Sequence, residues 1–245
     1  PARRRLAGWR AGLAYAFVVL ILLLVLTPHF GILLLSVSKV WSFSMLPEGY
    51  TLAHYATVLS DSSRMIGNTL LYCGLAAGID VVLGTAIAYL LLRTRLPGRQ
   101  WLDWGASAAL AIPGIVLAIG FYAAYTTKPL LLYGTAWILI LAFATRFLPI
   151  AYSNSDAALR SINPELEDAA RILGASRLLA LRRVVVPLLR RGLAGAFILV
   201  FIPALGTFLI SDLLGGPDSQ LIGNVIERQF KSANNLPLGA AMSFI

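Results

Sequence analysis

The chain has 245 residues, of which 58% are hydrophobic and 13% are charged. Soluble domains carry about 25% charged residues, so this composition indicates a membrane protein. The net charge of +9 does not indicate nucleic-acid binding, because long apolar runs separate the basic residues, and arginine-rich loops of a membrane protein explain it better. The single cysteine, Cys73, excludes a disulfide framework and a CxxC metal or redox site.

Five stretches have about the 20 apolar residues that are needed to cross a bilayer. They are residues 13–37, 66–92, 104–125, 130–150 and 193–214. A sixth begins at "PLGAAMSFI" and is incomplete at the last residue, Ile245. The sequence therefore predicts an all-α membrane protein with about six transmembrane helices, forming one transmembrane domain over residues 1–245.

Two features inside these spans bear on helix geometry. Pro113-Gly114 is expected to kink the third span, as proline does within a helix. Gly74, Gly78 and Gly84 in the second span suit close packing of one membrane helix against another.

The distribution of Lys and Arg predicts the orientation of the spans. With a cytoplasmic N-terminus, the inner segments hold 15 of the 20 Lys and Arg residues, as the positive-inside rule expects. This inner set consists of Arg3, Arg4, Arg5, Arg10, Arg93, Arg95, Arg99, Arg146 and the seven arginines from Arg160 to Arg191. Residues 151–192 are therefore predicted to form a cytoplasmic loop between the fourth and fifth spans.

This loop contains a short helix with clear start and stop signals. Asn163 is a favoured N-cap, and Pro164 suits the first helical position. Gly174 is placed to end the helix in a left-handed cap. Ser176 can cap a second, basic helix, and Pro187 is expected to break or kink that helix before the fifth span. Acidic residues occupy the first turns, where the helix dipole favours negative charge: Glu165, Glu167 and Asp168.

The predicted loop helix has one narrow apolar stripe, which consists of Leu166, Ala170 and Leu173. Glu167 and Arg171 are spaced to form an i, i+4 ion pair, worth a few tenths of a kcal/mol. These features fit two interpretations equally well. The helix either lies on the membrane surface or on its own bundle, or it docks into a groove of a soluble partner.

The segment from Glu167 to Pro187 reads EDAARILGASRLLALRRVVVP. It resembles the EAA loop of permease subunits in ATP-binding-cassette (ABC) importers, whose pattern is E-A-A-x3-G-x9-I-x-L-P. Every spacing matches, and Asp168, Val184 and Val186 stand in place of Glu, Ile and Leu. The resemblance favours the docking interpretation, because in that family the short helix lies in a groove of the ATPase subunit.

The resemblance implies a permease subunit of a type I ABC importer, a multi-pass protein of the bacterial inner membrane. It implies a second permease, homologous or identical, two cytoplasmic ATPases and an extracytoplasmic substrate-binding protein as partners, with lipid around the chain and no nucleic acid. ATP and Mg²⁺ would be bound by the ATPases, so this chain is expected to need no cofactor, metal or catalytic residue of its own. The residues expected to couple it to the ATPase are Glu165, Glu167, Asp168, Ala169, Ala170 and Gly174.

Two groups of segments resemble permeases for different substrates. "SDLLGGP" followed by "LIGNVI", within residues 201–230, is similar to spermidine and putrescine permeases. "AYLLLRTRLPGRQWLD" and "ALAIPGIVLAIGF" are instead similar to ferric-iron and phosphonate permeases. Polyamines are therefore the first expectation, with ferric iron or aminoethylphosphonate as the alternative.

A polycation would need carboxylates or aromatic faces along its route. Asp80 in the second span and Asp212 at the outer end of the fifth are candidates for such a path. Three tyrosines are expected at a similar depth in the membrane: Tyr72, Tyr122 and Tyr125. The alternative for Asp80 is a polar partner, or a neutral carboxyl, inside the bundle.

Other classes of protein are poorly supported. The sequence has no GxxxxGK[ST] phosphate loop, no GxSxG and no HExxH motif, so it is not expected to be an ATPase or a hydrolase. A secondary carrier that works without ATP remains the alternative from another class. Such carriers usually have more than six helices arranged as repeats, and this sequence shows no internal repeat.

Overall fold

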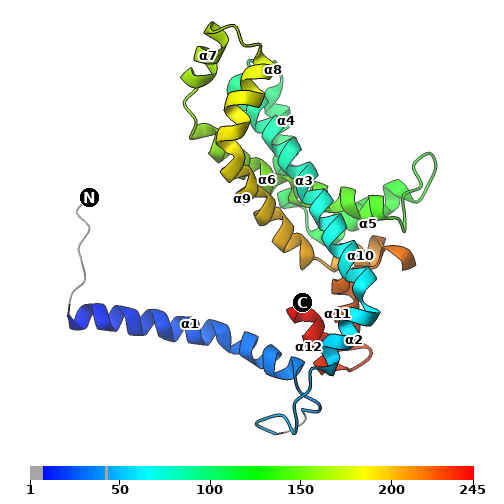
Figure 1. Cartoon of the computed structure of the whole chain (residues 1–245). Helices are drawn as coiled ribbons and strands as arrows, with labels where there is room; N and C mark the ends of the chain where they lie inside the picture. Colours follow the sequence, from blue (N-terminus) through cyan, green and yellow to red (C-terminus); the bar gives the residue numbers. More distant parts are fainter. Residues whose placement is uncertain (1–7, 42–43) are drawn as a thin grey trace. The chain divides into compact units, whose positions relative to one another are not determined.

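The computed structural model describes residues 8–41 and 44–245; the predicted orientation signals Arg3, Arg4 and Arg5 lie outside this part. Across the described residues every regular element is helical, with two isolated β-bridges, which confirms the all-α prediction (Figure 1). The chain forms two compact units. One contains the chain up to Ser63 together with Val225–Ile245, and the other contains Arg64–Asn224.

Among the described residues, four helical runs are long and apolar enough to cross a membrane. They are α1 (Trp9–Ser36), α3 (Ser63–Arg93), α6 (Ala136–Arg160) and the run Arg177–Leu205, which joins α8 (Arg177–Ala180), η1 (Leu181–Val185) and α9 (Val186–Leu205). A bent pair, α4 (Arg99–Ala111) and α5 (Gly114–Tyr125), makes a fifth candidate if both helices belong to one span. The shorter elements are α2 (Ala53–Asp61), α7 (Glu165–Ile172), α10 (Leu209–Leu214), η2 (Pro217–Ser219), α11 (Ile222–Lys231) and α12 (Leu236–Phe244).

The first unit is built around α1, which packs against α12, and α12 also packs against α2. The C-terminal end of α1 is joined to α2 by the Ser36 hydroxyl, which lies 2.7 Å from the Tyr55 hydroxyl. No other described residue buries the apolar stretch of α1. An apolar surface of this length requires a nonaqueous environment, as expected for the first predicted span.

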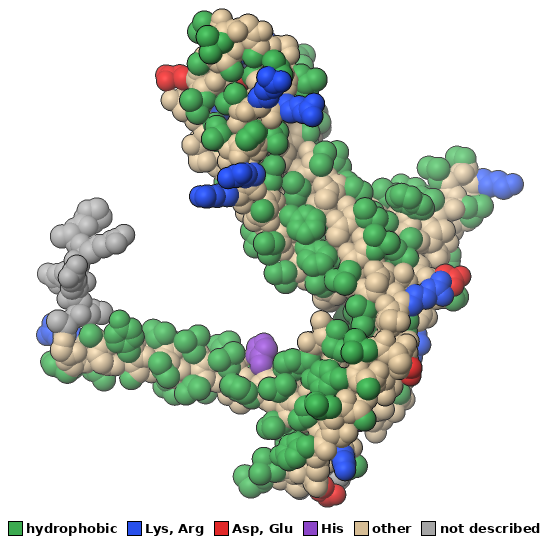
Figure 2. Space-filling model, in the orientation of Figure 1, with side chains coloured by type: hydrophobic (Ala, Val, Ile, Leu, Met, Phe, Trp, Pro, Cys, Tyr) green, Lys and Arg blue, Asp and Glu red, His purple; other side chains and the backbone are tan. Residues whose placement is uncertain are grey.

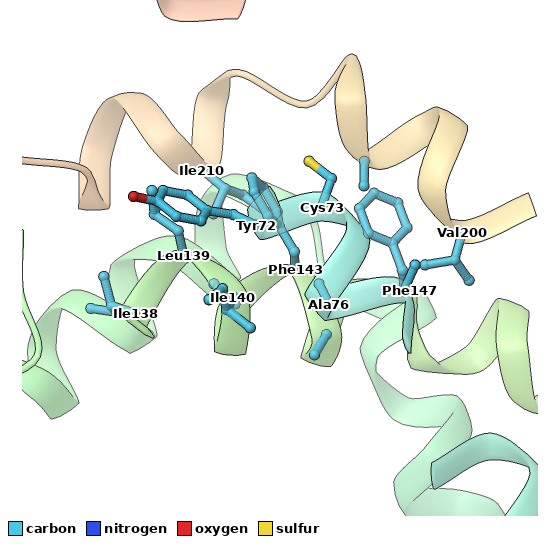
Figure 3. Close-up of a cluster of buried hydrophobic side chains, with 14 of the residues drawn as sticks. Tyr72, Cys73, Ala76, Ile138, Leu139, Ile140, Phe143, Phe147, Val200 and Ile210 are labelled. Carbon is cyan, nitrogen blue, oxygen red and sulfur yellow. The ribbon is translucent and has the colours of Figure 1, made fainter. Parts of the chain in front are cut away.

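The second unit has its core on α6, which packs against α4, α5, α9 and α10. Figure 3 shows this core, where side chains from α3, α6, α9 and α10 meet, among them Tyr72, Phe143, Val200 and Ile210. Gly84 of α3 sits where α6 comes closest. A Cβ built on Gly84 would lie 2.7 Å from the backbone nitrogen of Tyr152, so only glycine allows this approach. Of the three glycines predicted to serve close packing, Gly84 does so within the chain, whereas a Cβ at Gly78 would meet nothing within 4 Å and one at Gly74 only a side-chain atom at 3.9 Å.

The predicted third span is two helices, bent by 111° between Ala111 and Gly114. Ile112 is extended, with φ −94° and ψ 124°, because the residue before a proline is disfavoured in the helical region. The bend leaves carbonyl groups at the end of α4 without helical partners. Nη1 of Arg146 donates to two of them, those of Ala109 and Ile112, at 2.9 and 2.8 Å.

Arg146 lies in the middle of α6. Its assignment to the segment after the fourth span was therefore wrong. In the sequence "AFATRFLPIAY", the arginine follows an apolar run, a pattern that usually indicates the end of a membrane span. In the fold, the half-buried guanidinium group is hydrogen-bonded to the carbonyl groups at the α4–α5 bend.

The expected break at Pro187 is also absent. The chain remains helical from Arg177 to Leu205, with a π-helical turn, η1, immediately before α9. Pro187 follows directly on this turn, as the second residue of α9. The wider π turn accommodates the ring without ending the helix, so α9 is continuous with the basic segment before it.

Candidate functional site

The segment between α6 and α9 forms the short helix that the capping signals predicted. Helix α7 begins at Glu165, and the Asn163 side-chain oxygen accepts a hydrogen bond from the Glu165 backbone nitrogen at 3.0 Å. Its location beside α8 is visible in Figure 1. The three predicted acids are all in the first turn, where the helix dipole favours them.

Helix α7 is followed at Gly174 by the left-handed cap that the sequence predicted. Gly174 has φ +94°, a conformation that costs other residues about 1–2 kcal/mol. The backbone nitrogen of Ala175 donates to the carbonyl of Ala170 at 3.0 Å, and that of Gly174 donates to Arg171, which together make a Schellman motif. Ser176 then caps α8 by accepting from the Leu179 nitrogen at 3.3 Å. The chain thus stops, turns sharply and starts a new helix.

The outer surface of this turn carries apolar side chains with little cover. Ile172, Leu173 and Leu178 are 86%, 88% and 74% exposed; we refer to these three as the exposed apolar group. The predicted stripe is only partly covered: Leu166 is 48% exposed and Ala170 is half-buried. Figure 2 shows that Lys and Arg side chains gather around the end of the second unit that bears α7 and α8. Exposed apolar side chains with charged surroundings are typical of a protein-binding surface.

The inner side of α7 faces α3 through Glu167. The Tyr89 hydroxyl donates a hydrogen bond to Oε1 of Glu167, and Nε of Arg93 lies 4.0 Å from Oε2. Both charged side chains are largely buried. The predicted pairing of Glu167 with Arg171 was therefore wrong: Arg171 instead lies 3.7 Å from Asp168, in an exposed pair. Sequence reasoning missed Tyr89 and Arg93, because their role depends on how α7 packs on α3.

A cavity of about 460 Å³ lies beside this contact. Its wall combines charged and polar side chains from the ends of α3, α7 and α8. The lining residues are Tyr89, Leu92, Arg93, Thr94, Pro164, Glu167, Asp168, Arg171, Arg177, Leu178 and Leu181.

The residues predicted for a substrate path differ in their surroundings. On α3, Asp80 is fully buried, and neither of its carboxylate oxygens has a hydrogen-bond partner among the described residues; Tyr72 is also buried. Asp212 on α10 is exposed and lies 3.4 Å from the Asn224 side-chain nitrogen. Tyr122, on α5, is 44% exposed.

Tyr125, the last predicted path residue, lies at the end of α5. Its ring is 5.4 Å from that of Phe121. Both side chains line an apolar groove of about 340 Å³ on α5. Asp80 and Asp212 are not among the residues that line this groove.

Relatives of known class match much of the chain. The ferric transport system permease protein of Actinobacillus pleuropneumoniae is 31% identical over 162 residues, which are 64% of this chain and 24% of that protein. The spermidine/putrescine transport system permease protein PotB of Haemophilus influenzae is 27% identical over 196 residues, 74% of this chain and 68% of that one. PotB of Escherichia coli K12 is 36% identical over 115 residues, 47% and 42% of the two chains. The chain thus spans about a quarter of the ferric permease that it matches.

Solved structures share the fold. A bacterial ABC transporter involved in the import of the acidic polysaccharide alginate matches with a TM-score of 0.69 and 18% identity, over 96% of this chain and 90% of that one. The MetNI methionine ABC transporter, in an inward-facing conformation, matches with a TM-score of 0.58 and 20% identity, over 73% and 85% of the two chains.

The family model described as the binding-protein-dependent transport system inner membrane component matches residues 80–245. These residues contain the α7 loop, the bent α4–α5 pair and most of the core built on α6. The chain therefore belongs to the family of inner-membrane permease components of binding-protein-dependent, ABC-type transport systems.

Proposed function

We propose that this chain forms half of the translocation path of an ATP-driven importer and receives its driving force through α7. The observation that carries the proposal is the geometry of α7. This helix is fixed at both ends by caps, its inner side contacts α3, and its outer side ends in the exposed apolar group. An exposed helix end of this kind fits a groove on a partner, and the EAA-like spacing makes that partner an ATPase.

The orientation proposed from the sequence puts α7 and the N-terminus in the cytoplasm. The charges near α7 support it, because five arginines follow within the continuous helix that enters the bundle: Arg177, Arg182, Arg183, Arg190 and Arg191. Arginines concentrate on the cytoplasmic side of membrane spans. Removal of Arg146 from the inner set lowers its count to 14 of 20, which leaves the bias in place.

The complete importer is proposed to contain a second permease, two ATPases that bind ATP and Mg²⁺, and an extracytoplasmic binding protein. The family description supports the last of these, since it names transport that depends on a binding protein. Closure of the ATPases would draw the two α7 helices together and open the path outward. This chain then supplies structure and movement, and the partner supplies hydrolysis.

Polyamines are the substrates that we propose first, with ferric iron as the alternative. The match to PotB of H. influenzae supports polyamines because it covers 74% of this chain and 68% of that protein. The ferric permease match supports iron at a similar identity, but over a smaller share of that protein. A binding screen of the cognate binding protein against spermidine, putrescine, ferric iron and aminoethylphosphonate distinguishes these substrates.

If a cation passes near the two predicted carboxylates, Asp80→Asn and Asp212→Asn should each lower polyamine uptake about tenfold or more. Each change removes a charge-assisted contact worth about 1.5–3 kcal/mol. Radiolabelled spermidine uptake into cells provides the measurement. Asp218→Asn is the control, because this exposed carboxylate pairs with Arg64 at the surface. Uptake that is unchanged in both Asp80→Asn and Asp212→Asn would remove the cation path from the proposal.

The class of transporter is tested by purifying the chain from its native membrane. We expect an ATPase subunit to copurify, and uptake by reconstituted vesicles to require ATP. A chain that purifies alone, with uptake that follows an ion gradient, would instead establish a secondary carrier.

A further inference from the structure

We propose that Glu167 is a positioning residue that fastens α7 to α3 and α6, so that displacement of α7 moves both membrane helices. This inference rests on the proposed function, because it describes how force received by α7 leaves it. The residues that form the joint are Glu167, Tyr89 and Arg93, which we call the Glu167 cluster.

Arg93 connects three helices through one guanidinium group. It is the last residue of α3, and its Nη2 donates to the carbonyls of Ile162 at 2.8 Å and Leu159 at 3.3 Å. These carbonyls belong to the end of α6 and the turn after it. The same guanidinium faces Glu167 of α7. A shift of Glu167 therefore acts on α3 directly and on α6 through Arg93.

Within α7, few side chains are available for this task. Only Glu167 and Ala170 are not exposed, and Ala170 has no polar group. Asp168 and Arg171 pair with each other at the surface. Besides the backbone at its two ends, α7 packs against α8 and the π-helical turn η1, and Glu167 is the α7 side chain with a polar contact to α3. Loss of this contact should leave the helix folded, because its caps involve other residues.

The energetics of the Glu167 cluster favour a mechanical role over a stabilising one. A largely buried ion pair adds little net stability, because desolvation offsets the attraction between the charges. Here the pair is also long: Nε of Arg93 and Oε2 of Glu167 are 4.0 Å apart, and neither has a hydrogen-bond partner among the described residues. The adjoining cavity of about 460 Å³ leaves room for the two groups to approach. The contact can therefore adjust as α7 moves without breaking.

The test measures substrate imported per ATP hydrolysed in the reconstituted transporter with its ATPases and binding protein. Tyr89→Phe removes only the hydroxyl that Glu167 binds, and Glu167→Gln removes the charge at nearly constant size. Each is expected to lower the import-to-hydrolysis ratio about tenfold, within the range of coupling between distant sites. The double variant should be at least as uncoupled as either single variant, because an amide at position 167 can still accept from the Tyr89 hydroxyl and the two changes remove different contacts of one cluster.

Tyr152→Phe is the matched control. It removes a comparable hydrogen bond, from the Tyr152 hydroxyl to Asp103 at 2.6 Å, which joins α6 to α4 and does not involve α7. Its import-to-hydrolysis ratio should equal that of the unmodified protein. A merely structural role of Glu167 would reduce the amount of assembled transporter while leaving the ratio in the assembled fraction unchanged.

The outcomes separate this inference from the proposed function. If the ATPase copurifies with all variants and the ratio stays unchanged in Tyr89→Phe and Glu167→Gln, the positioning role is overturned and the proposed function stands. If the ratio falls equally in Tyr152→Phe, the role is not specific to α7 and is likewise overturned. If no ATPase accompanies the unmodified chain, both fail.

Discussion

Leu173→Asp is expected to abolish copurification of the ATPase while leaving the chain inserted in the membrane. Leu173 is 88% exposed and belongs to the exposed apolar group at the end of α7. In a groove of the partner, a carboxylate at this position would be buried without a partner, at a cost of about 3–5 kcal/mol. That cost weakens binding by more than a hundredfold. Affinity purification of the tagged chain, followed by quantification of the bound ATPase, measures the effect.

Gln100→Asp is the matched control for this change. Gln100 is an exposed residue in the first turn of α4, where an acidic side chain is compatible with the helix dipole. It should retain the ATPase at the level of the unmodified chain. Full retention of the ATPase by Leu173→Asp would show that the exposed apolar group is not the docking surface.

Gly84→Val should strongly destabilise the second unit. A Cβ at position 84 would lie 2.7 Å from the Tyr152 nitrogen and 2.9 Å from the Ala151 carbonyl carbon. These are backbone atoms of the central helix α6, so they cannot move aside as a flexible side chain would. Overpacking of this kind costs about 3 kcal/mol, which corresponds to a fall in Tm of about 10 °C for a chain of this size.

Cys73 gives a direct way to measure the fall in Tm that Gly84→Val is expected to cause. It is the only cysteine in the sequence and is fully buried on α3, so a thiol-reactive fluorogenic dye reports unfolding as the temperature rises. Gly78→Val is the control, because a Cβ at Gly78 on the same helix meets nothing within 4 Å. Equal melting of the two variants would contradict the close approach of α3 and α6 at Gly84.

The parts of the fold that sequence reasoning predicted well are those set by local interactions. The caps at Asn163, Gly174 and Ser176 depend on residues within five positions along the chain. Backbone geometry fixes such contacts almost independently of the rest of the fold. The apolar composition likewise predicted long membrane-capable helices, since it reflects the bilayer and not any one neighbour. Their bounds were less accurate: the spans predicted at 130–150 and 193–214 are α6 (Ala136–Arg160) and the run Arg177–Leu205.

The parts that were missed depend on contacts between distant segments. Glu167 has a local partner available in Arg171, but it binds Tyr89, 78 positions earlier in the chain. From the sequence, Arg146 has the position of a loop residue after a span, and only the hydrogen bond to the carbonyl of Ala109 in α4 explains its place within a helix. Pro113 predicted a kink, whereas the 111° angle depends on where α4 and α5 find partners. Local propensity cannot rank these options, because the energies of tertiary contacts exceed it.

The proposed function depends on α7 receiving force from an ATPase. The most direct measurement places a photoreactive side chain at Ile172, which is 86% exposed at the end of α7, in transporter isolated from native membranes. Irradiation should cross-link this position to an ATP-binding subunit, and the yield should change when ATP is added. Cross-links confined to lipid, or to this chain itself, would contradict the claim.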